Sequence, residues 1–138
     1  MKAWRHIAMV ALFALVVAPG ANAQAKRATA SPALQKEFNT YIGKFRDALK
    51  ANDSAAIAAM TKLPFHHDHA MLDAAQFRAK AYPHYFTARN RACIQRGRAV
   101  YDRDGDNSEN YFIFCGSLIF VFTKTATGFV FNEIGEND

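Results

Sequence analysis

The residues with the most evident chemistry lie in one short segment formed by His66, His67, Asp68 and His69. Imidazole and carboxylate groups can bind a first-row metal, and they can also act as general acids or bases. In an extended segment His66 would share a face with Asp68, whereas in a helical turn it would share a face with His69. Neither spacing matches a zinc motif. We therefore expect a solvated loop or an acid/base group, with no metal and no cofactor; a zinc site at His66 and His69 is the alternative.

The two cysteines, Cys93 and Cys115, form an even pair. If Tyr101 pairs with Ser108 across a turn, the cysteines face each other on neighbouring strands within one residue of register. Facing positions have the Cα separation of about 5.5 Å that a disulfide needs. The sequence therefore predicts a structural disulfide, with two buried thiols or a redox-active pair as alternatives.

Two further polar clusters have simpler interpretations. The segment from Asp102 to Glu109 places acids as a calcium loop does, but it has Asn107 where such a loop needs glycine, so a hairpin turn is expected. The arginines from Arg89 to Arg103 are expected on a solvated face of a strand, with an anion site as the alternative. No glycine-rich phosphate loop and no Gly-x-Ser-x-Gly motif is present in the sequence.

The first 23 residues have the pattern of an export signal. A basic start precedes an apolar stretch from Ile7 to Ala18, and small residues then lead to a cleavage site between Ala23 and Gln24. The apolar stretch is too short to cross a hydrocarbon core of about 30 Å as a helix. We expect residues 1–23 to be removed, residues 24–30 to form a flexible tail, and the mature protein to be periplasmic or secreted, without a membrane anchor.

Charge and composition exclude several function classes. The 138-residue chain has a formal net charge of +5, and removal of Lys2 and Arg5 with the signal lowers it to +3. So small a surplus does not favour a nucleic-acid or membrane-surface partner. The many Phe and Tyr residues that remain favour a packed core over disorder.

Residues 31–83 are expected to be helical for the most part. Ser31 is a candidate N-cap for a helix over 32–51, in which apolar residues recur every three or four positions. A short second helix should follow Asn52 or Asp53 and reach Met60. A short edge strand or extended segment is expected at 63–65, and a third helix should begin near Asp73, with Pro83 ending it.

The second half changes to the period of strands. We expect a strand over 93–101, a polar turn over 102–110, an aromatic and β-branched run over 111–123, a turn over 125–128 and a last strand over 129–134. Helices followed by an antiparallel meander predict one α+β domain, with the helices on one face of a curved sheet.

The order of these segments resembles that of the NTF2-like superfamily over residues 31–138. The resemblance rests on the first helix ending in Ala48–Asp53, the alanine-rich second helix, Leu63-Pro64-Phe65, a helix around Phe77, and strands closing with Phe120–Phe122 and Gly128–Phe131. It implies a cone in which a strongly curved antiparallel sheet wraps the first helix and leaves a pocket at its open end.

The resemblance also implies where a site would lie. The residues expected to line or fill the cone are Tyr41, Phe112, Phe114, Phe120 and Phe122. Acid/base groups of related enzymes project from the segment after the second helix, which here makes Asp68, His66, His67 and His69 the candidate catalytic residues. Ketosteroid isomerases pair a tyrosine with a protonated aspartate; Tyr41 and Tyr111 are available here, but the expected strands carry no inward-facing acid before Glu133.

We therefore expect an exported single-domain protein that binds a small apolar or amphipathic ligand, or a protein partner, in the cone pocket without catalysis. The alternative is a small hydratase, isomerase or cyclase that uses a His or Asp as general base on a hydrophobic substrate. A homodimer formed through the sheet is a further expectation.

Overall fold

The computed structural model describes residues 27–138, so the predicted signal and its cleavage site lie outside the described residues. The helical segments are α1 (Pro32–Lys50), α2 (Ser54–Ala59), α3 (Ala74–Gln76), a π-helical turn η1 (Phe77–Ala81), α4 (Tyr82–Tyr85) and α5 (Ala88–Arg96). The strands are β1 (Phe65–His67), β2 (Ala70–Leu72), β3 (Val100–Arg103), β4 (Glu109–Cys115), β5 (Leu118–Thr125) and β6 (Gly128–Glu136). The predicted single α+β domain is confirmed.

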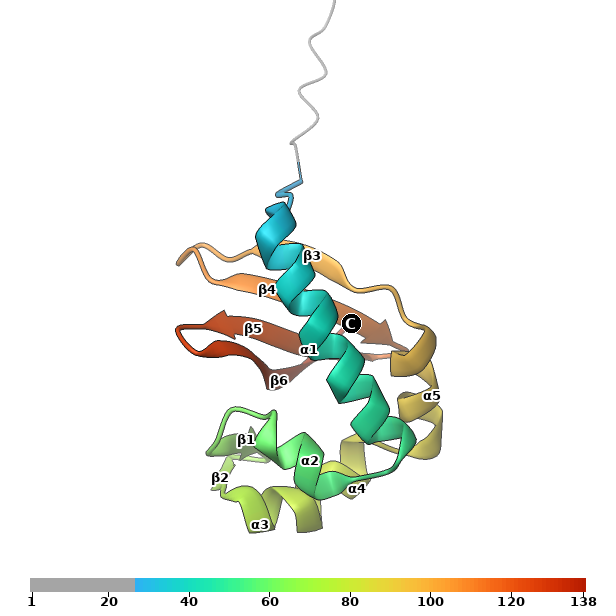
Figure 1. Cartoon of the computed structure of the whole chain (residues 1–138). Helices are drawn as coiled ribbons and strands as arrows, with labels where there is room; N and C mark the ends of the chain where they lie inside the picture. The colour runs from blue at the N-terminus through green and yellow to red at the C-terminus, as the bar shows by residue number, and fades with distance from the viewer. Residues whose placement is uncertain (1–26) are drawn as a thin grey trace, which may run out of the picture.

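Helix α1 is the longest helix of the described chain and forms as its sequence predicts. The Ser31 side chain accepts a hydrogen bond from the Leu34 amide at 3.2 Å, and Pro32 occupies the first turn, where no amide donor is needed. The apolar stripe is buried along its whole length: Leu34, Phe38, Ile42, Phe45 and Leu49. The stripe packs α1 across one face of the sheet (Figure 1).

Strands β3 to β6 form a four-stranded antiparallel meander in the order β3-β4-β5-β6. The expected single run over 111–123 is divided by a tight turn at Gly116, whose φ of +66° suits glycine. A register shift between Val121 and Phe122 interrupts the pairing of β5 with β6. The sheet is nevertheless not strongly curled (Figure 1), so the strong curvature expected from the resemblance is not confirmed.

The predicted strand over 93–101 is wrong, because its first residues belong to helix α5. The Thr87 hydroxyl caps that helix by accepting the Asn90 amide at 3.2 Å, and Gly97 ends it. Strand β3 begins only at Val100, and Tyr101 pairs with Tyr111, three residues from the expected register. The arginines of α5 therefore do not lie on a sheet face.

The third helical region begins at the Asp73 capping box, as predicted, but it does not stop at Pro83. The π-helical turn η1 ends at Ala81, and Pro83 falls in the first turn of α4, a position that tolerates a missing amide donor. The helical path consequently continues to Tyr85 before α5 begins.

The segment after α2 attaches to the free edge of the sheet and then forms a hairpin. The Lys62 amide donates to the Phe131 carbonyl at 2.8 Å, and the Phe131 amide donates to the Met60 carbonyl at 2.8 Å. Strands β1 and β2 then pair across a two-residue turn at Asp68 and His69, both with positive φ. The expected extended segment at 63–65 is thus the entry to a hairpin.

Candidate functional site

The space between α1 and the sheet is filled by aromatic side chains. Phe120 and Phe122 are fully buried, and the Phe45 ring meets Phe122 edge-on with 5.1 Å between centroids. Phe38 stacks on Tyr111 at 3.7 Å. Phe120 and Phe122, the two β5 residues expected to line or fill the cone, therefore fill the core.

Two residues expected to face inward lie on the other face of the sheet. Tyr111 and Ile113 are the inward, buried residues of β4, so Phe112 and Phe114 point outward. Phe114 is 49% exposed. Side chains alternate along β4 as predicted, but Tyr111 and Ile113 face the core where Phe112 and Phe114 were expected to do so.

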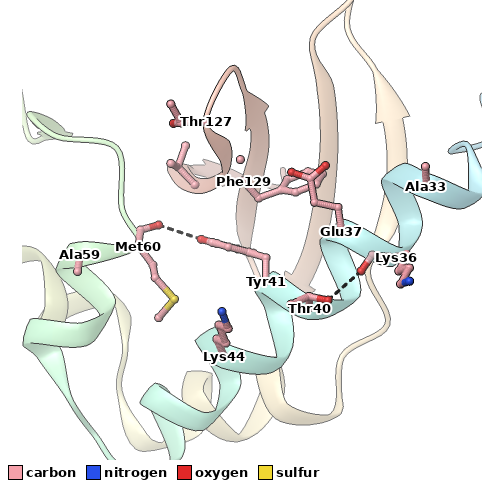
Figure 2. A pocket seen from close by; sticks show the side chains of 12 residues that line it. Ala33, Lys36, Glu37, Thr40, Tyr41, Lys44, Ala59, Met60, Thr127 and Phe129 are labelled. Carbon is pink, nitrogen blue, oxygen red and sulfur yellow. Dashed lines mark hydrogen bonds between the residues drawn. The ribbon is translucent and has the colours of Figure 1, made fainter.

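A groove of about 670 Å³ runs along the side of α1 that neighbours its buried stripe (Figure 2). A cavity of this size is in the range of small-molecule sites. One wall is a second stripe on α1, and the other comes from the end of α2 and the β5–β6 hairpin. The lining residues are Ala33, Lys36, Glu37, Thr40, Tyr41, Lys44, Ala59, Met60, Thr127, Gly128, Phe129 and Val130.

The floor of the groove is aromatic and held in place by hydrogen bonds. The Tyr41 and Phe129 ring centroids lie 6.0 Å apart, and Phe129 is buried. The Tyr41 hydroxyl donates to the Met60 carbonyl at 2.9 Å, the same oxygen that accepts the Phe131 amide (Figure 2). Burial raises the pKa of Tyr41 well above its ordinary value, so the phenol remains a neutral donor.

The rim of the groove is positively charged. Glu37 forms a 2.7 Å ion pair with Lys124 of β5, which offsets its charge. Lys36 and Lys44 lie eight residues apart on α1 on either side of Thr40, and neither forms a salt bridge within residues 27–138. The groove thus combines an apolar floor with two ammonium groups, an arrangement that suits an amphipathic anion.

Several polar side chains of the lining already have hydrogen-bond or charge partners. The Thr40 hydroxyl donates to the Lys36 carbonyl within its own helix, and the Tyr41 phenol is committed to Met60. Glu37 is held by Lys124. These three groups are therefore already engaged within the protein.

The His/Asp segment lies away from this groove, on the β1–β2 hairpin. His67 is 12% exposed, and its Nδ1 lies 3.0 Å from the Tyr85 hydroxyl, while its Nε2 lies 3.4 Å from the Asp68 carboxylate. The Tyr85 hydroxyl and His67 Nδ1 therefore share a hydrogen bond. Burial raises the pKa of Tyr85, with smaller contributions from Asp68 and Glu136.

The remaining members of the segment face solvent. Asp68 is 84% exposed, and His66 and His69 are also exposed. None of the four candidate residues lines the groove. Within the described chain, no three His, Cys, Asp or Glu side chains are placed to hold a metal ion.

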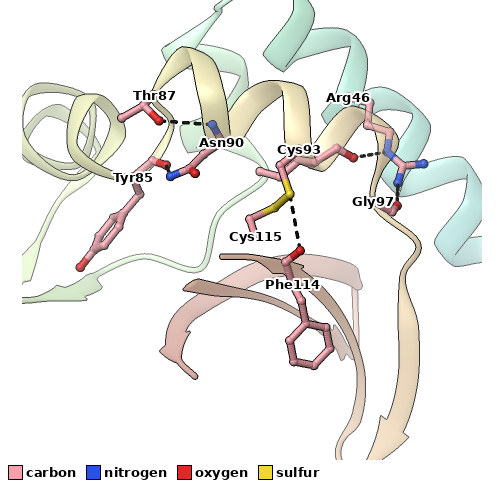
Figure 3. The surroundings of a disulfide bond; sticks show 9 residues. Arg46, Tyr85, Thr87, Asn90, Cys93, Gly97, Phe114 and Cys115 are labelled. Carbon is pink, nitrogen blue, oxygen red and sulfur yellow. Dashed lines mark hydrogen bonds between the residues drawn. A yellow bond between two sulfur atoms is a disulfide. The ribbon is translucent and has the colours of Figure 1, made fainter. Parts of the chain in front are cut away.

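Cys93 and Cys115 form a disulfide, as predicted, but it joins a helix to a strand instead of two strands. It connects α5 to the end of β4, with 5.9 Å between Cα atoms (Figure 3). The same helix is tied to α1, because the Arg46 guanidinium donates to the Ile94 carbonyl at 3.0 Å and the Gly97 carbonyl at 2.7 Å. No helix between residues 27 and 138 is long and apolar enough to span a bilayer.

Sequence reasoning missed most of the groove, apart from Tyr41. Its α1 residues recur every three or four positions, like the buried stripe, but Lys36 and Lys44 were not among the predicted site residues. The periodic arrangement of these residues beside the apolar stripe was the one sequence signal for the α1 wall of the groove. Met60 and Phe129 join the site only through tertiary packing. Comparison of the chain with protein-family models, curated proteins and solved structures found no match.

Proposed function

We propose that this protein is an exported, non-catalytic binding domain that takes a small amphipathic ligand with an anionic headgroup. The ligand lies in the groove between α1 and the β5–β6 hairpin. Its apolar part rests on Tyr41, Met60 and Phe129, and its headgroup is held by Lys36 or Lys44.

The observation that carries this proposal is the combination of a groove of about 670 Å³ with two lysines that have no acidic partner within residues 27–138. Solvent-exposed lysines contribute little by themselves. Beside an apolar floor, however, an ammonium group supplies the point charge that orients an amphiphile, while burial of its chain supplies the affinity.

Export and membership of the NTF2-like superfamily are part of the proposal. Export is supported by the signal-like pattern of residues 1–23 and by the Cys93–Cys115 disulfide, since such bonds persist in oxidising compartments. The family assignment is supported by the order of the elements, with helices first and an antiparallel meander after them, and by α1 packing across the sheet.

Calorimetric titration with decanoate and with 1-decanol tests the groove. The two compounds share an alkyl chain and differ in the headgroup, so decanoate should bind more tightly. The substitution Lys44→Glu should weaken decanoate binding by about tenfold or more, in line with a charged hydrogen bond. It should leave 1-decanol binding nearly unchanged.

Lys50→Glu is the matched control, because it makes the same charge change on α1 outside the groove. Ala59→Trp should reduce the binding of both compounds by filling the groove. Equal loss of decanoate binding in the Lys44 and Lys50 variants would show a general charge effect and contradict the proposal. Failure of the wild-type protein to bind either compound would also contradict it.

We also propose that the outer face of the sheet pairs with a second copy of the chain. Val100 and Phe112 are register partners and share that face with Phe114. Val100 is 39% exposed, which leaves an apolar patch next to the open edge of β3. Light scattering should show a dimer that Phe114→Glu dissociates; a wild-type monomer at high concentration would contradict this.

A further inference from the structure

The β1–β2 hairpin brings together two side chains of a kind that bind soft metal ions. His66 and Met71 are direct cross-strand partners, so their side chains leave the same face of the hairpin. The turn has two residues, so the pair beside it, His67 and Ala70, carries the hydrogen bonds. His66 and Met71 are therefore of the non-hydrogen-bonded kind, with Cα atoms about 4.5 Å apart and side chains closest together.

Both side chains of the pair are accessible. Met71 is 57% exposed, the highest value among the large apolar residues that lie outside the core of the described chain, and His66 is exposed as well. An exposed thioether contributes nothing to the core, so packing does not account for Met71.

The opposite face of the hairpin holds the pair in position. Phe65 and Leu72 are buried, and the Phe65 ring stacks on Phe131 of β6 with 5.5 Å between centroids. Phe77 meets the Phe65 ring edge-on, with 5.2 Å between centroids. Because the strands cannot slide or turn over without exposing these aromatics, the spacing of His66 and Met71 is preorganised.

We propose that His66 and Met71 form a binding site for Cu(I). A thioether is a soft ligand that selects Cu(I) over zinc, magnesium or calcium, and imidazole is also a copper ligand. The neighbouring carboxylate of Asp68 lies 3.4 Å from Nε2 of His67, whose side chain leaves the opposite face of the hairpin from His66. This site is independent of the groove.

Silver(I) is the appropriate first probe, because it has the ligand preference of Cu(I) but needs no reductant that would break the Cys93–Cys115 disulfide. The mature protein in chloride-free buffer should bind one tightly held Ag(I) per chain by native mass spectrometry. Met71→Leu, which removes the sulfur at similar volume, should weaken that binding at least tenfold, and His66→Gln should do the same. Met60→Leu removes the other thioether of residues 24–138 and His84→Gln another exposed imidazole; neither should change the affinity.

Methionine oxidation gives a second measurement. Hydrogen peroxide should convert Met71 to the sulfoxide, and one equivalent of Ag(I) should slow this severalfold because the ion occupies the sulfur lone pair. Oxidation of Met60 should be unaffected. Equal Ag(I) affinity in the wild-type and Met71→Leu proteins, or an oxidation rate of Met71 that Ag(I) does not alter, would overturn the proposal.

Discussion

Helix α1 has two adjacent stripes of different character. The first, from Leu34 to Leu49, is buried against the sheet, and its Phe45 is fully buried and contacts four aromatic rings. The second, from Ala33 to Lys44, lines the groove and keeps its charges in solvent. Both recur every three or four residues, so one helix supplies core contacts on one side and a wall of the groove on the other.

The apolar periodicity of α1 locates the core, while the neighbouring polar stripe lines the groove. Tyr41 lies at the boundary, because its ring stacks beside Phe45 at 6.0 Å and its hydroxyl reaches Met60 across the groove. If the two stripes are functionally separate, substitutions on the first should change stability, and substitutions on the second should change binding.

The largest effect is expected for Phe45→Ala. Removal of a fully buried ring leaves a cavity among Phe86, Phe122 and Phe131 and should lower the free energy of unfolding by about 3–5 kcal/mol. Urea unfolding measures this.

Thr40→Ala on the second stripe is the paired control and should change the free energy of unfolding by less than about 0.5 kcal/mol. If Phe45→Ala does not fold, Phe45→Leu should still be destabilised by a smaller amount. Similar losses of unfolding free energy in Phe45→Ala and Thr40→Ala would contradict the distinction between the two stripes.

The disulfide should affect stability without affecting the groove. Replacing Cys93 and Cys115 together by Ser opens a loop of 22 residues in sequence separation and should cost about 3 kcal/mol on the chain-entropy model. Decanoate affinity should stay within about twofold, because no lining residue belongs to α5 or β4. A large loss of affinity in a variant that remains folded would show that the framework and the groove are coupled.

The first stripe could be predicted from sequence because its signals are local. The Ser31 cap, Pro32 and the spacing of the apolar residues specify α1 to within one residue of its end. The failure at α5 is equally instructive. Thr87 and Gly97 marked its two ends, but the period of strands was extended back to residue 93, and the expected facing of Cys93 and Cys115 rested on that strand. A helix packed on a strand satisfies the same separation, so the pairing was right although the element was wrong.

The second stripe could not be predicted from its residue types. Chemical type directed attention to the histidines after α2, whereas the groove is assembled from three segments that meet only in the fold: 33–44, 59–60 and 127–130. Lysine and threonine on a helix surface are ordinary solvated residues until another segment forms a wall opposite them.

Tyr41→Phe tests the boundary between the stripes through pH. Near neutral pH the variant should be less stable by about 1 kcal/mol, the contribution of one hydrogen bond. Burial raises the pKa of Tyr41 above its unfolded value, so folding favours the neutral phenol. The stabilisation is complete below a pH of about 10 and is lost as the unfolded tyrosine ionises above it, by up to about 1.4 kcal/mol per pH unit.

Urea unfolding should be measured for the wild-type and Tyr41→Phe proteins from neutral pH to about pH 11. The difference between their free energies of unfolding should shrink above pH 10 and then change sign. The other tyrosines whose pKa burial raises, Tyr82, Tyr85 and Tyr111, are present in both proteins and cancel in the comparison. A difference that stays constant with pH would mean that the Tyr41 hydroxyl is not buried.

The smallest effect is expected for Glu37→Gln, which removes the one carboxylate on the groove wall. Its ion pair with Lys124 is partly exposed, so its loss should cost less than about 1 kcal/mol of stability and less still at high salt. Decanoate binding should instead strengthen about two- to threefold, because Lys124 is released and no negative charge faces the headgroup. Glu133→Gln on β6, outside the groove, should leave the affinity unchanged. Weaker decanoate binding in the Glu37 variant would contradict the proposed position of the anionic headgroup beside this wall.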